Sequence, residues 1–209
     1  MPLGYIYRCN DVESNIYMAS DDSYLLIDTI KKEIGSIIGI RTLLDLGSGS
    51  GVIARALYSM LDDGFYKEDI IAIDISPCSV EYIKRTRIRE DLWGIEILQC
   101  NGPTCLRDNS IDLVAINPPY LPLNERNSWL DISWSGGYKG VSVALEFLKE
   151  LRRVTRRRGL IYIVLSTLGD LEYFKEKASR LGYLLEVIAR KKLFFEELLV
   201  YRIYSSDHM

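Results

Sequence analysis

The sequence has few residues suited to acid–base catalysis near neutral pH or to metal binding. Its 209 residues include a single histidine, His208, next to the C-terminus, where chains commonly fray. Histidine is the side chain that ordinarily titrates near pH 7. Since the single histidine lies at the end of the chain, we expect no catalytic histidine. The cysteines lack the second close pair or the internal histidine that a zinc set needs. We expect no metal site, and we interpret the cysteines as small buried thiols: Cys9, Cys78, Cys100 and Cys105.

Long apolar runs and targeting signals are also missing. No apolar stretch reaches membrane-spanning length, and the N-terminal MPLGYIYRCNDVESN lacks the basic-then-apolar pattern of a signal peptide. Linker-like tracts and internal repeats are absent too. We therefore expect a cytoplasmic protein without a membrane partner, folded as one domain over residues 1–209. Residues 1–40 are expected to cover the functional site, and residues 41–209 to form the core.

A basic overall charge is lacking as well. The formal net charge is −3 and the isoelectric point is near 5.4, which argues against a surface that binds nucleic acid throughout. One basic run, RRVTRRRG at 152–159, stands out. We interpret it as the solvated end of a helix, where arginines favour the helix dipole. A local docking patch is the alternative.

Hydrophobic periodicity predicts alternating strands and helices. This alternation is typical of an α/β fold with a parallel sheet covered by helices on both faces. We expect a seven-stranded, mostly parallel sheet that closes with a C-terminal antiparallel hairpin. Helices are expected over 20–35, 51–61, 77–91, 141–155 and 171–182, and strands over 41–46, 69–74, 94–100, 111–117, 159–167, 183–193 and 197–205.

A glycine-rich loop, DLGSGSG at 45–51, follows the first strand and opens the next helix. Such a loop brings the backbone close to a ligand, and GSGVIA at 49–54 even fits the dinucleotide fingerprint. Asp74, at the end of the second strand, suits the ribose of either a dinucleotide or another adenosine cofactor. Asp45 lies where a dinucleotide would place its pyrophosphate. A cofactor that carries an amino group and no phosphate fits better.

A rigid corner, Asn117-Pro118-Pro119-Tyr120, ends the fourth strand. Two prolines fix the backbone and cannot continue a strand. The Asn117 side-chain oxygen and the Pro118 carbonyl can each accept a hydrogen from a planar NH2 group, and Tyr120 can pack on it. The corner therefore predicts a double acceptor for an amide or amino nitrogen.

These motifs resemble those of class I S-adenosylmethionine-dependent methyltransferases that act on planar nitrogens: DLGSGSG, AIDIS (72–76) and NPPY. Two further segments resemble the archaeal and eukaryotic HemK-type methyltransferases, which modify the glutamine of the Gly-Gly-Gln motif in class I translation termination (release) factors. They are IYMASDDSYLLIDTI (16–30) and WSGGYKGVSVALEFL (134–148). The resemblance implies a Rossmann-like fold, the N5-glutamine methyltransferase reaction, and S-adenosylmethionine as cofactor with S-adenosylhomocysteine as product.

The resemblance also implies roles for individual residues. The family segment Tyr-x-Pro-x-Glu-Asp appears here with Tyr17 and Asp22 aligned, without its proline, and with Asp21 in place of glutamate. Catalysis is assigned to Asn117, Pro118 and Tyr120, and Pro119 joins them in binding the substrate. Cofactor contacts are assigned to Tyr17, Asp22, Asp45, Gly47, Gly49, Asp74, Ile75, Asn101 and Asn117.

The motifs leave other substrates open. Adenine N6 and guanine N2 present the same planar amine, so an RNA or DNA amino-methyltransferase is an alternative. Nucleic acid is not expected as the main substrate, because the chain is acidic and lacks aromatic residues interleaved with basic ones. A lysine methyltransferase is a second alternative, although lysine must first lose a proton. A scaffold without catalysis is a third.

A partner is expected by resemblance. The short HemK-type branch is similar in needing a small zinc-binding activator protein, with which it forms a heterodimer. The third strand should lie at a sheet edge, and residues 93–100 are apolar for an exposed edge. We expect the activator to bind there.

GGYKG at 136–140 has two interpretations, a flexible loop over the substrate cleft or an ordinary loop before a helix.

Overall fold

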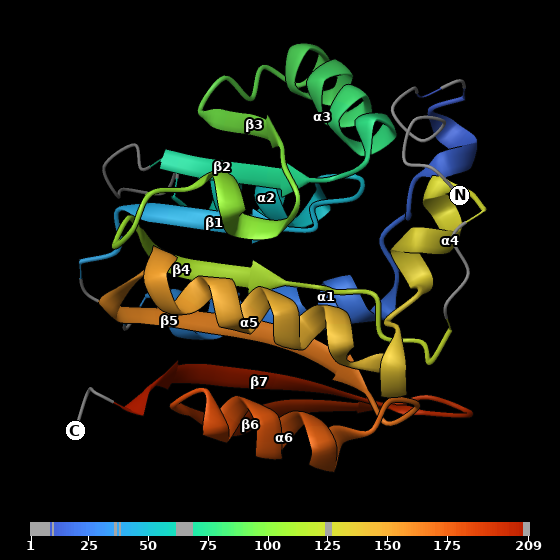
Figure 1. Cartoon of the computed structure of the whole chain (residues 1–209). Coiled ribbons are helices and arrows are strands. Elements are labelled where there is room, and N and C mark those ends of the chain that lie inside the picture. The colour runs from blue at the N-terminus through green and yellow to red at the C-terminus, as the bar shows by residue number, and fades with distance from the viewer. Residues whose placement is uncertain are drawn as a thin grey trace.

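The computed structural model describes residues 9, 11–35, 37, 39–61, 69–123 and 127–206 (Figure 1). His208 lies outside the described residues, so its predicted lack of a role stays a prediction. Seven strands form one sheet in the order β3-β2-β1-β4-β5-β7-β6. They are β1 (Thr42–Leu46), β2 (Asp69–Asp74), β3 (Ile95–Gln99), β4 (Ile111–Ile116), β5 (Thr155–Ser166), β6 (Tyr183–Lys192) and β7 (Glu197–Ser205).

The pairing of the strands confirms the predicted fold class. From β3 to β5 all neighbours are parallel, and β7 runs antiparallel between β5 and β6. The helices are α1 (Asp21–Ile34), α2 (Val52–Leu61), α3 (Pro77–Arg89), α4 (Trp129–Trp134), α5 (Ser142–Val154) and α6 (Leu171–Arg180), with short 3-10 turns at Glu13–Asn15, Gly102–Cys105 and Tyr138–Gly140.

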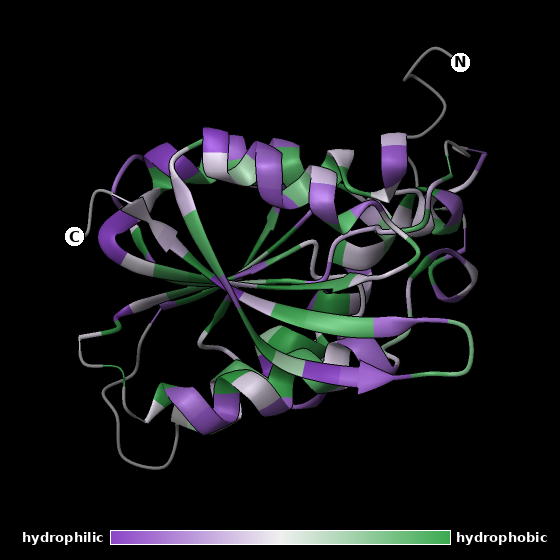
Figure 2. Cartoon of the chain, turned by 90° about the horizontal axis from the view of Figure 1, so that it is seen from below, coloured by the Kyte–Doolittle hydropathy of each residue, from purple (hydrophilic) through white to green (hydrophobic). Residues whose placement is uncertain are grey.

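The core lies on both faces of the sheet, and Figure 2 shows helices above and below the strands. On one face α1, α2 and α3 contribute Leu26, Ala54 and Ile83. On the other, α5 and α6 contribute Leu148 and Phe174. Because both faces are covered, central strands such as β4 are almost continuously apolar and buried.

Local sequence fixes where the helices next to the site begin. Ser76 caps α3 by accepting from the amides of Cys78 and Ser79, and Pro77 occupies the first turn, where no backbone donor is needed. In α4, Ser128 and Asp131 form a reciprocal capping box. These caps set the positions of the loops after β2 and before α4.

The basic run at 152–159 forms the predicted helix end only in its first part, because Arg152 and Arg153 lie in the last turn of α5. Helix α5 ends at Val154 and β5 begins at Thr155, so the later arginines lie on a strand. Arg156 binds both carboxylate oxygens of Asp112, at 3.0 and 3.1 Å. Arg153 donates to the Leu106 carbonyl and to Asp108, at 2.7 and 2.8 Å. These two side chains are therefore used inside the fold.

The cysteines also differ from expectation. They form two disulfides, Cys9–Cys78 and Cys100–Cys105, with Cα atoms 4.9 and 6.2 Å apart. Both separations lie in the range that a disulfide spans. The prediction of free buried thiols was wrong because folding brings residue 9 beside the first turn of α3, a contact between positions 69 residues apart.

The described residues contain neither a membrane-spanning helix nor a cluster of metal ligands. No helix there combines the length and apolarity that crossing a bilayer requires. Within the same ranges, no group of three or more His, Cys, Asp or Glu side chains is arranged to hold a metal ion.

Candidate active site

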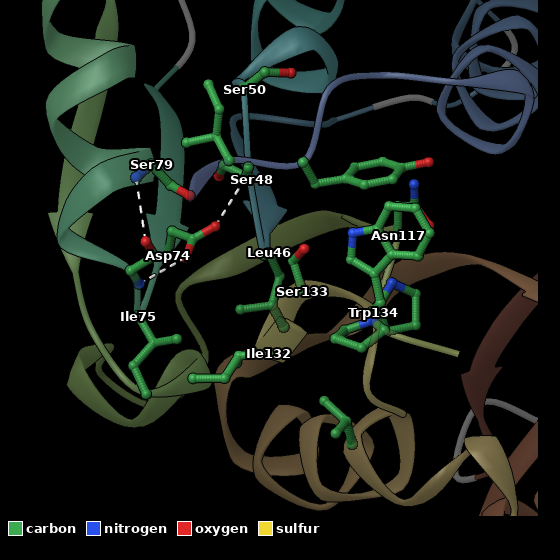
Figure 3. A pocket seen from close by; sticks show the side chains of 18 of the residues that line it. Leu46, Ser48, Ser50, Asp74, Ile75, Ser79, Asn117, Ile132, Ser133 and Trp134 are labelled. Carbon is green, nitrogen blue, oxygen red and sulfur yellow. Dashed lines mark hydrogen bonds between the residues drawn. The ribbon is translucent and has the colours of Figure 1, made fainter. Parts of the chain in front are cut away.

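A pocket of about 840 Å³ opens at the carboxyl ends of the parallel strands. This edge is where open α/β sheets bind ligands. The loops after β1, β2, β3 and β4 form its walls, and the segment before α1, residues 15–20, which we call the strap, covers it together with α4. In Figure 3, Asp74 and Asn117 lie at opposite ends of the pocket.

The loop after β1 depends on its glycines. Gly47 and Gly49 have φ values of +77° and +54°, in the region that side chains disfavour. The amides of Gly47 and Ser48 both donate to the Ile73 carbonyl, at 2.9 and 3.0 Å. A Cβ on Gly49 would also contact the Tyr17 carbonyl at 3.4 Å. The loop is thus held tightly between β2 and the strap.

Asp74 presents its carboxylate to the pocket at the end of β2 (Figure 3). One oxygen accepts from the Gly49 amide and the other from the Ser76 amide, both at 2.8 Å. Burial raises the pKa of Asp74, while these amides oppose the shift. The carboxylate is therefore fixed in one orientation by the two loops that it joins.

Asp45 lies behind the glycine loop and does not line the pocket. Its side chain is fully buried, and one oxygen accepts from the Ala54 amide at 3.0 Å. The other oxygen has no hydrogen-bond partner among the described residues. Burial raises the pKa of Asp45 to about 7, and the charge of Asp74 adds to the shift. Asp45 was assigned to cofactor binding, but unlike the other assigned residues it does not line the pocket.

The Asn-Pro-Pro-Tyr corner is bonded to the start of α1. Asn117 Nδ2 donates to Ser23 Oγ at 3.0 Å, and the Tyr120 hydroxyl donates to Asp22 at 2.9 Å. The Tyr17 hydroxyl donates to both oxygens of the same carboxylate, at 2.9 and 2.8 Å. Burial, followed by the charge of Asp22, raises the pKa of both tyrosines. The two residues aligned with the family segment, Tyr17 and Asp22, therefore bind each other.

The loop at 136–140 packs against the back of this corner. A Cβ on Gly136 would lie 2.8 Å from the Pro119 carbonyl oxygen, and one on Gly140 would overlap the Tyr120 carbonyl oxygen. The Gly136 amide donates to the Leu121 carbonyl at 2.8 Å. These close contacts hold the corner in place. The loop at 136–140 is therefore a structural support for the corner, which we call the buttress, and not a flexible cover.

The charge of the lining distinguishes between ligands. Its ionisable side chains include the carboxylates of Asp22, Asp74 and Glu196, and no lysine, arginine or histidine lines it within the described ranges. Glu196 is held by the Ser166 hydroxyl. These carboxylates would repel the negative charge of a pyrophosphate, and no described cation in the lining offsets that repulsion. It favours a ligand that is neutral or positively charged.

The chain matches the model of the methyltransferase small domain over residues 19–192. The chain belongs to this methyltransferase family. It is 28% identical to a protein N5-glutamine methyltransferase of Methanocaldococcus jannaschii, with 88% of this chain and 89% of that protein aligned. It is 24% identical to the eRF1 methyltransferase catalytic subunit mtq2 of Schizosaccharomyces pombe, covering 91% and 89% of the two chains.

A solved structure with the same fold is that of the E. cuniculi Mtq2-Trm112 complex, which methylates the eRF1 translation termination factor. The TM-score is 0.70 at 21% identity, covering 92% of this methyltransferase and 99% of that chain.

Most of the assigned site residues of this methyltransferase meet in one pocket, and Asp45 is the exception. The prediction missed lining residues from α4, because six residues are too few to show helical periodicity. It also missed Ser23, although its place at the start of a predicted helix was a signal. The lining residues assigned from the sequence are Tyr17, Asp22, Gly47, Gly49, Asp74, Ile75, Asn101, Asn117, Pro118, Pro119 and Tyr120.

Proposed function

We propose that this methyltransferase transfers a methyl group from S-adenosylmethionine to the side-chain nitrogen of the glutamine in the Gly-Gly-Gln motif of a class I translation termination factor. The observation that supports the proposal is that Asn117, Pro118, Pro119 and Tyr120 line the same pocket as the carboxylates of Asp22, Asp74 and Glu196. The Asn117 side-chain oxygen and the Pro118 carbonyl would be the acceptors for a planar NH2 group. The names of the relatives from M. jannaschii and S. pombe support the same reaction.

S-adenosylmethionine fits the pocket on charge and shape. S-adenosylmethionine carries an ammonium and a sulfonium group and no phosphate. These charges suit the pocket, because Asp22, Asp74 and Glu196 line it and no lysine, arginine or histidine does so among the described residues. Asp74 would hold the ribose hydroxyls, and Gly47 and Gly49 would let the backbone approach the cofactor. Asn101 and Ile75 would lie beside the adenine, and Tyr17 would cover the cofactor.

The chemistry that the bound cofactor supplies is an electrophilic methyl group on a positively charged sulfur. The residues of the chain orient the glutamine nitrogen, whose lone pair is otherwise delocalised into its carbonyl. Asn117 Oδ1 and the Pro118 carbonyl each accept one N–H, and Pro119 and Tyr120 confine the flat amide. The C–N bond forms as the C–S bond breaks, and the nitrogen then releases a proton to water. No side chain with a pKa near 7 has to take that proton in the transition state.

The alternatives are less well supported by the pocket. A nucleic acid would need free basic residues near the site. The exposed arginines of the basic run, Arg157 and Arg158, lie at the amino end of β5, whereas the pocket opens at the carboxyl ends of the parallel strands. A lysine substrate would stay protonated among the carboxylates of the lining, because nearby negative charge raises the pKa of an ammonium group. A glutamine amide is neutral, so it needs neither basic residues beside the pocket nor the loss of a proton before it reacts.

We also propose that a small zinc-binding activator protein pairs with β3. This strand is at the edge of the sheet and bonds to β2 alone among the described strands. Large apolar side chains are exposed near it: Trp93, Leu98 and Ile88 are 57%, 37% and 65% exposed. An unpaired apolar edge of this kind invites strand addition.

The experiment is a transfer assay with labelled S-adenosylmethionine, a class I termination factor and the activator. A factor with the motif glutamine changed to alanine and total RNA are run in parallel. We expect label on the intact factor alone, with more label when the activator is present. Label on RNA would replace the proposal with a nucleic-acid reaction. Cofactor binding without transfer to the factor or the RNA, even with the activator present, would indicate the scaffold role.

A further inference from the structure

A chain of hydrogen bonds joins the strap to the catalytic corner through two adjacent residues at the start of α1. Asp22 is 2% exposed, and it accepts from the hydroxyls of Tyr17 and Tyr120 and from the Ser23 amide at 2.5 Å. Ser23 is also 2% exposed, and its hydroxyl lies 3.2 Å from Asp22 and 3.0 Å from Asn117 Nδ2. One buried carboxylate is thus connected to both polar side chains of the corner.

The direction of each hydrogen bond in this chain follows from the carboxylate. The Ser23 hydroxyl donates its single hydrogen to Asp22. The oxygen of Ser23 then has only lone pairs left for Asn117. The group of Asn117 that faces Ser23 must therefore be the donor, Nδ2.

This directionality fixes which end of the Asn117 amide faces the substrate. With Nδ2 committed to Ser23, Oδ1 is left to accept from the glutamine NH2. The reversed amide would place Oδ1 against the lone pairs of Ser23 and would turn its own NH2 toward the NH2 of the substrate. Both contacts would be unfavourable, because buried polar groups that lack a complementary partner cost free energy.

We propose that Ser23 is a positioning residue, which Asp22 orients and which holds Asn117 with its oxygen toward the substrate amide. This inference rests on the proposed glutamine methylation. Asp22 is itself held by the strap and by the corner, because the hydroxyls of Tyr17 and Tyr120 both donate to it, which fixes its orientation toward Ser23.

The test compares Ser23→Ala with Ser23→Thr, which restores a hydroxyl at the same place. Ser59→Ala is the matched control, because Ser59 is an exposed helical serine whose hydroxyl bonds to the Arg55 carbonyl. For Ser23→Ala we expect kcat on the termination factor to fall about 100-fold, the loss typical of a misplaced reacting group. The Kd for S-adenosylmethionine should stay within about twofold, and Ser23→Thr should recover most of kcat.

A second measurement does not depend on the substrate. In the full-length chain with ¹⁵N-labelled asparagine, the side-chain NH2 signals of Asn117 are identified by their loss in Asn117→Ala. We expect these protons to exchange slowly with solvent in the native chain and in Ser59→Ala, and at least about tenfold faster in Ser23→Ala, since a hydrogen-bonded NH2 is protected.

The outcomes separate the inference from the function on which it rests. A native enzyme that leaves the glutamine unmodified would refute the proposed function, and the exchange measurement would still test the contact. A weaker Kd for the cofactor in Ser23→Ala with kcat unchanged would show that Ser23 binds cofactor instead. An unchanged exchange rate of the Asn117 NH2 would also overturn the inference.

Discussion

Two carboxylates at the ends of neighbouring strands, Asp74 and the fully buried Asp45, form different numbers of hydrogen bonds. Asp74 has an amide on each oxygen and faces the pocket. Asp45 has one amide and one unpartnered oxygen among the described residues, and it lies behind the pocket wall. An ionised Asp45 therefore has fewer hydrogen bonds to stabilise its charge than Asp74 has.

The first prediction concerns the pH dependence of stability. Burial raises the pKa of Asp45 from its ordinary 3.8 to about 7. Between these values the folded chain keeps a proton that the unfolded chain has released, so this residue makes stability fall as pH rises from about 4 to about 7. In Asp45→Asn this titration is gone.

The measurement is the melting temperature of both proteins from pH 5 to pH 8. We expect the melting temperature of Asp45→Asn minus that of the native chain to increase by several degrees over this interval. The loss of the contacts of Asp45 in the variant shifts the melting temperature by the same amount at every pH, so only the change of the difference with pH reports on the titration. A difference that stays flat or decreases with pH would show that Asp45 is already ionised at pH 5.

At the scale of elements, the catalytic corner is shaped by a loop that follows it in the chain. Gly136 and Gly140 are buried, and their lack of a Cβ lets the loop approach the carbonyls of Pro119 and Tyr120. Lys139 bonds to Asp170 at 2.6 Å, which ties the loop to the start of α6. The corner is therefore held by two contacts: the loop at 136–140, which is itself tied to the start of α6, and the first residues of α1.

The second prediction is that Gly140→Ala lowers both stability and activity. Its φ is +70°, and an added Cβ would overlap the Tyr120 carbonyl. We expect a loss of roughly 1–3 kcal/mol of unfolding free energy, from strain and displacement of the corner, and a lower kcat. Gly35→Ala is the control, because its φ is −65° and an added Cβ would meet nothing within 4 Å. Equal losses of stability in the two variants would contradict the buttress.

The sequence alone predicted the strands and the glycine loop, because each is marked by residues that are adjacent in the chain. Alternating apolar runs located all seven strands, and the strand-glycine-helix order placed Gly47, Gly49 and Asp74 around one pocket. Contacts between distant positions could not be predicted. The Asn117–Ser23 bond spans 94 residues, and the Cys9–Cys78 disulfide spans 69. The start of β5 at Thr155 was also missed, because it depends on Arg156 meeting Asp112 of β4.

At the scale of the whole molecule, the pocket and the exposed sheet edge lie on different parts of the protein. The pocket opens at the carboxyl ends of the central strands, whereas β3 ends the sheet on one side. A partner bound along β3 would leave the pocket open to a large protein substrate. This arrangement suits a heterodimer in which one subunit carries out the reaction.

The third prediction tests that arrangement. We expect Leu98→Asp to weaken binding of the activator by at least about tenfold, because a charge is buried when the edge is covered. Folding should be preserved, since Leu98 is 37% exposed in this chain. Leu168→Asp is the control, with a 43% exposed leucine after β5 and far along the sheet from β3. Binding constants from calorimetry that agree for the two variants would exclude β3 as the interface.

The most direct test of the account is to locate the transferred methyl group on the substrate. The termination factor is incubated with S-adenosylmethionine, the activator and either the native chain or Asn117→Ala, and its peptides are sequenced by mass spectrometry. We predict one added methyl group on the side-chain nitrogen of the Gly-Gly-Gln glutamine with the native chain. With Asn117→Ala we predict a rate at least about 100-fold lower. A methyl group on another residue, or an undiminished rate with Asn117→Ala, would contradict the account.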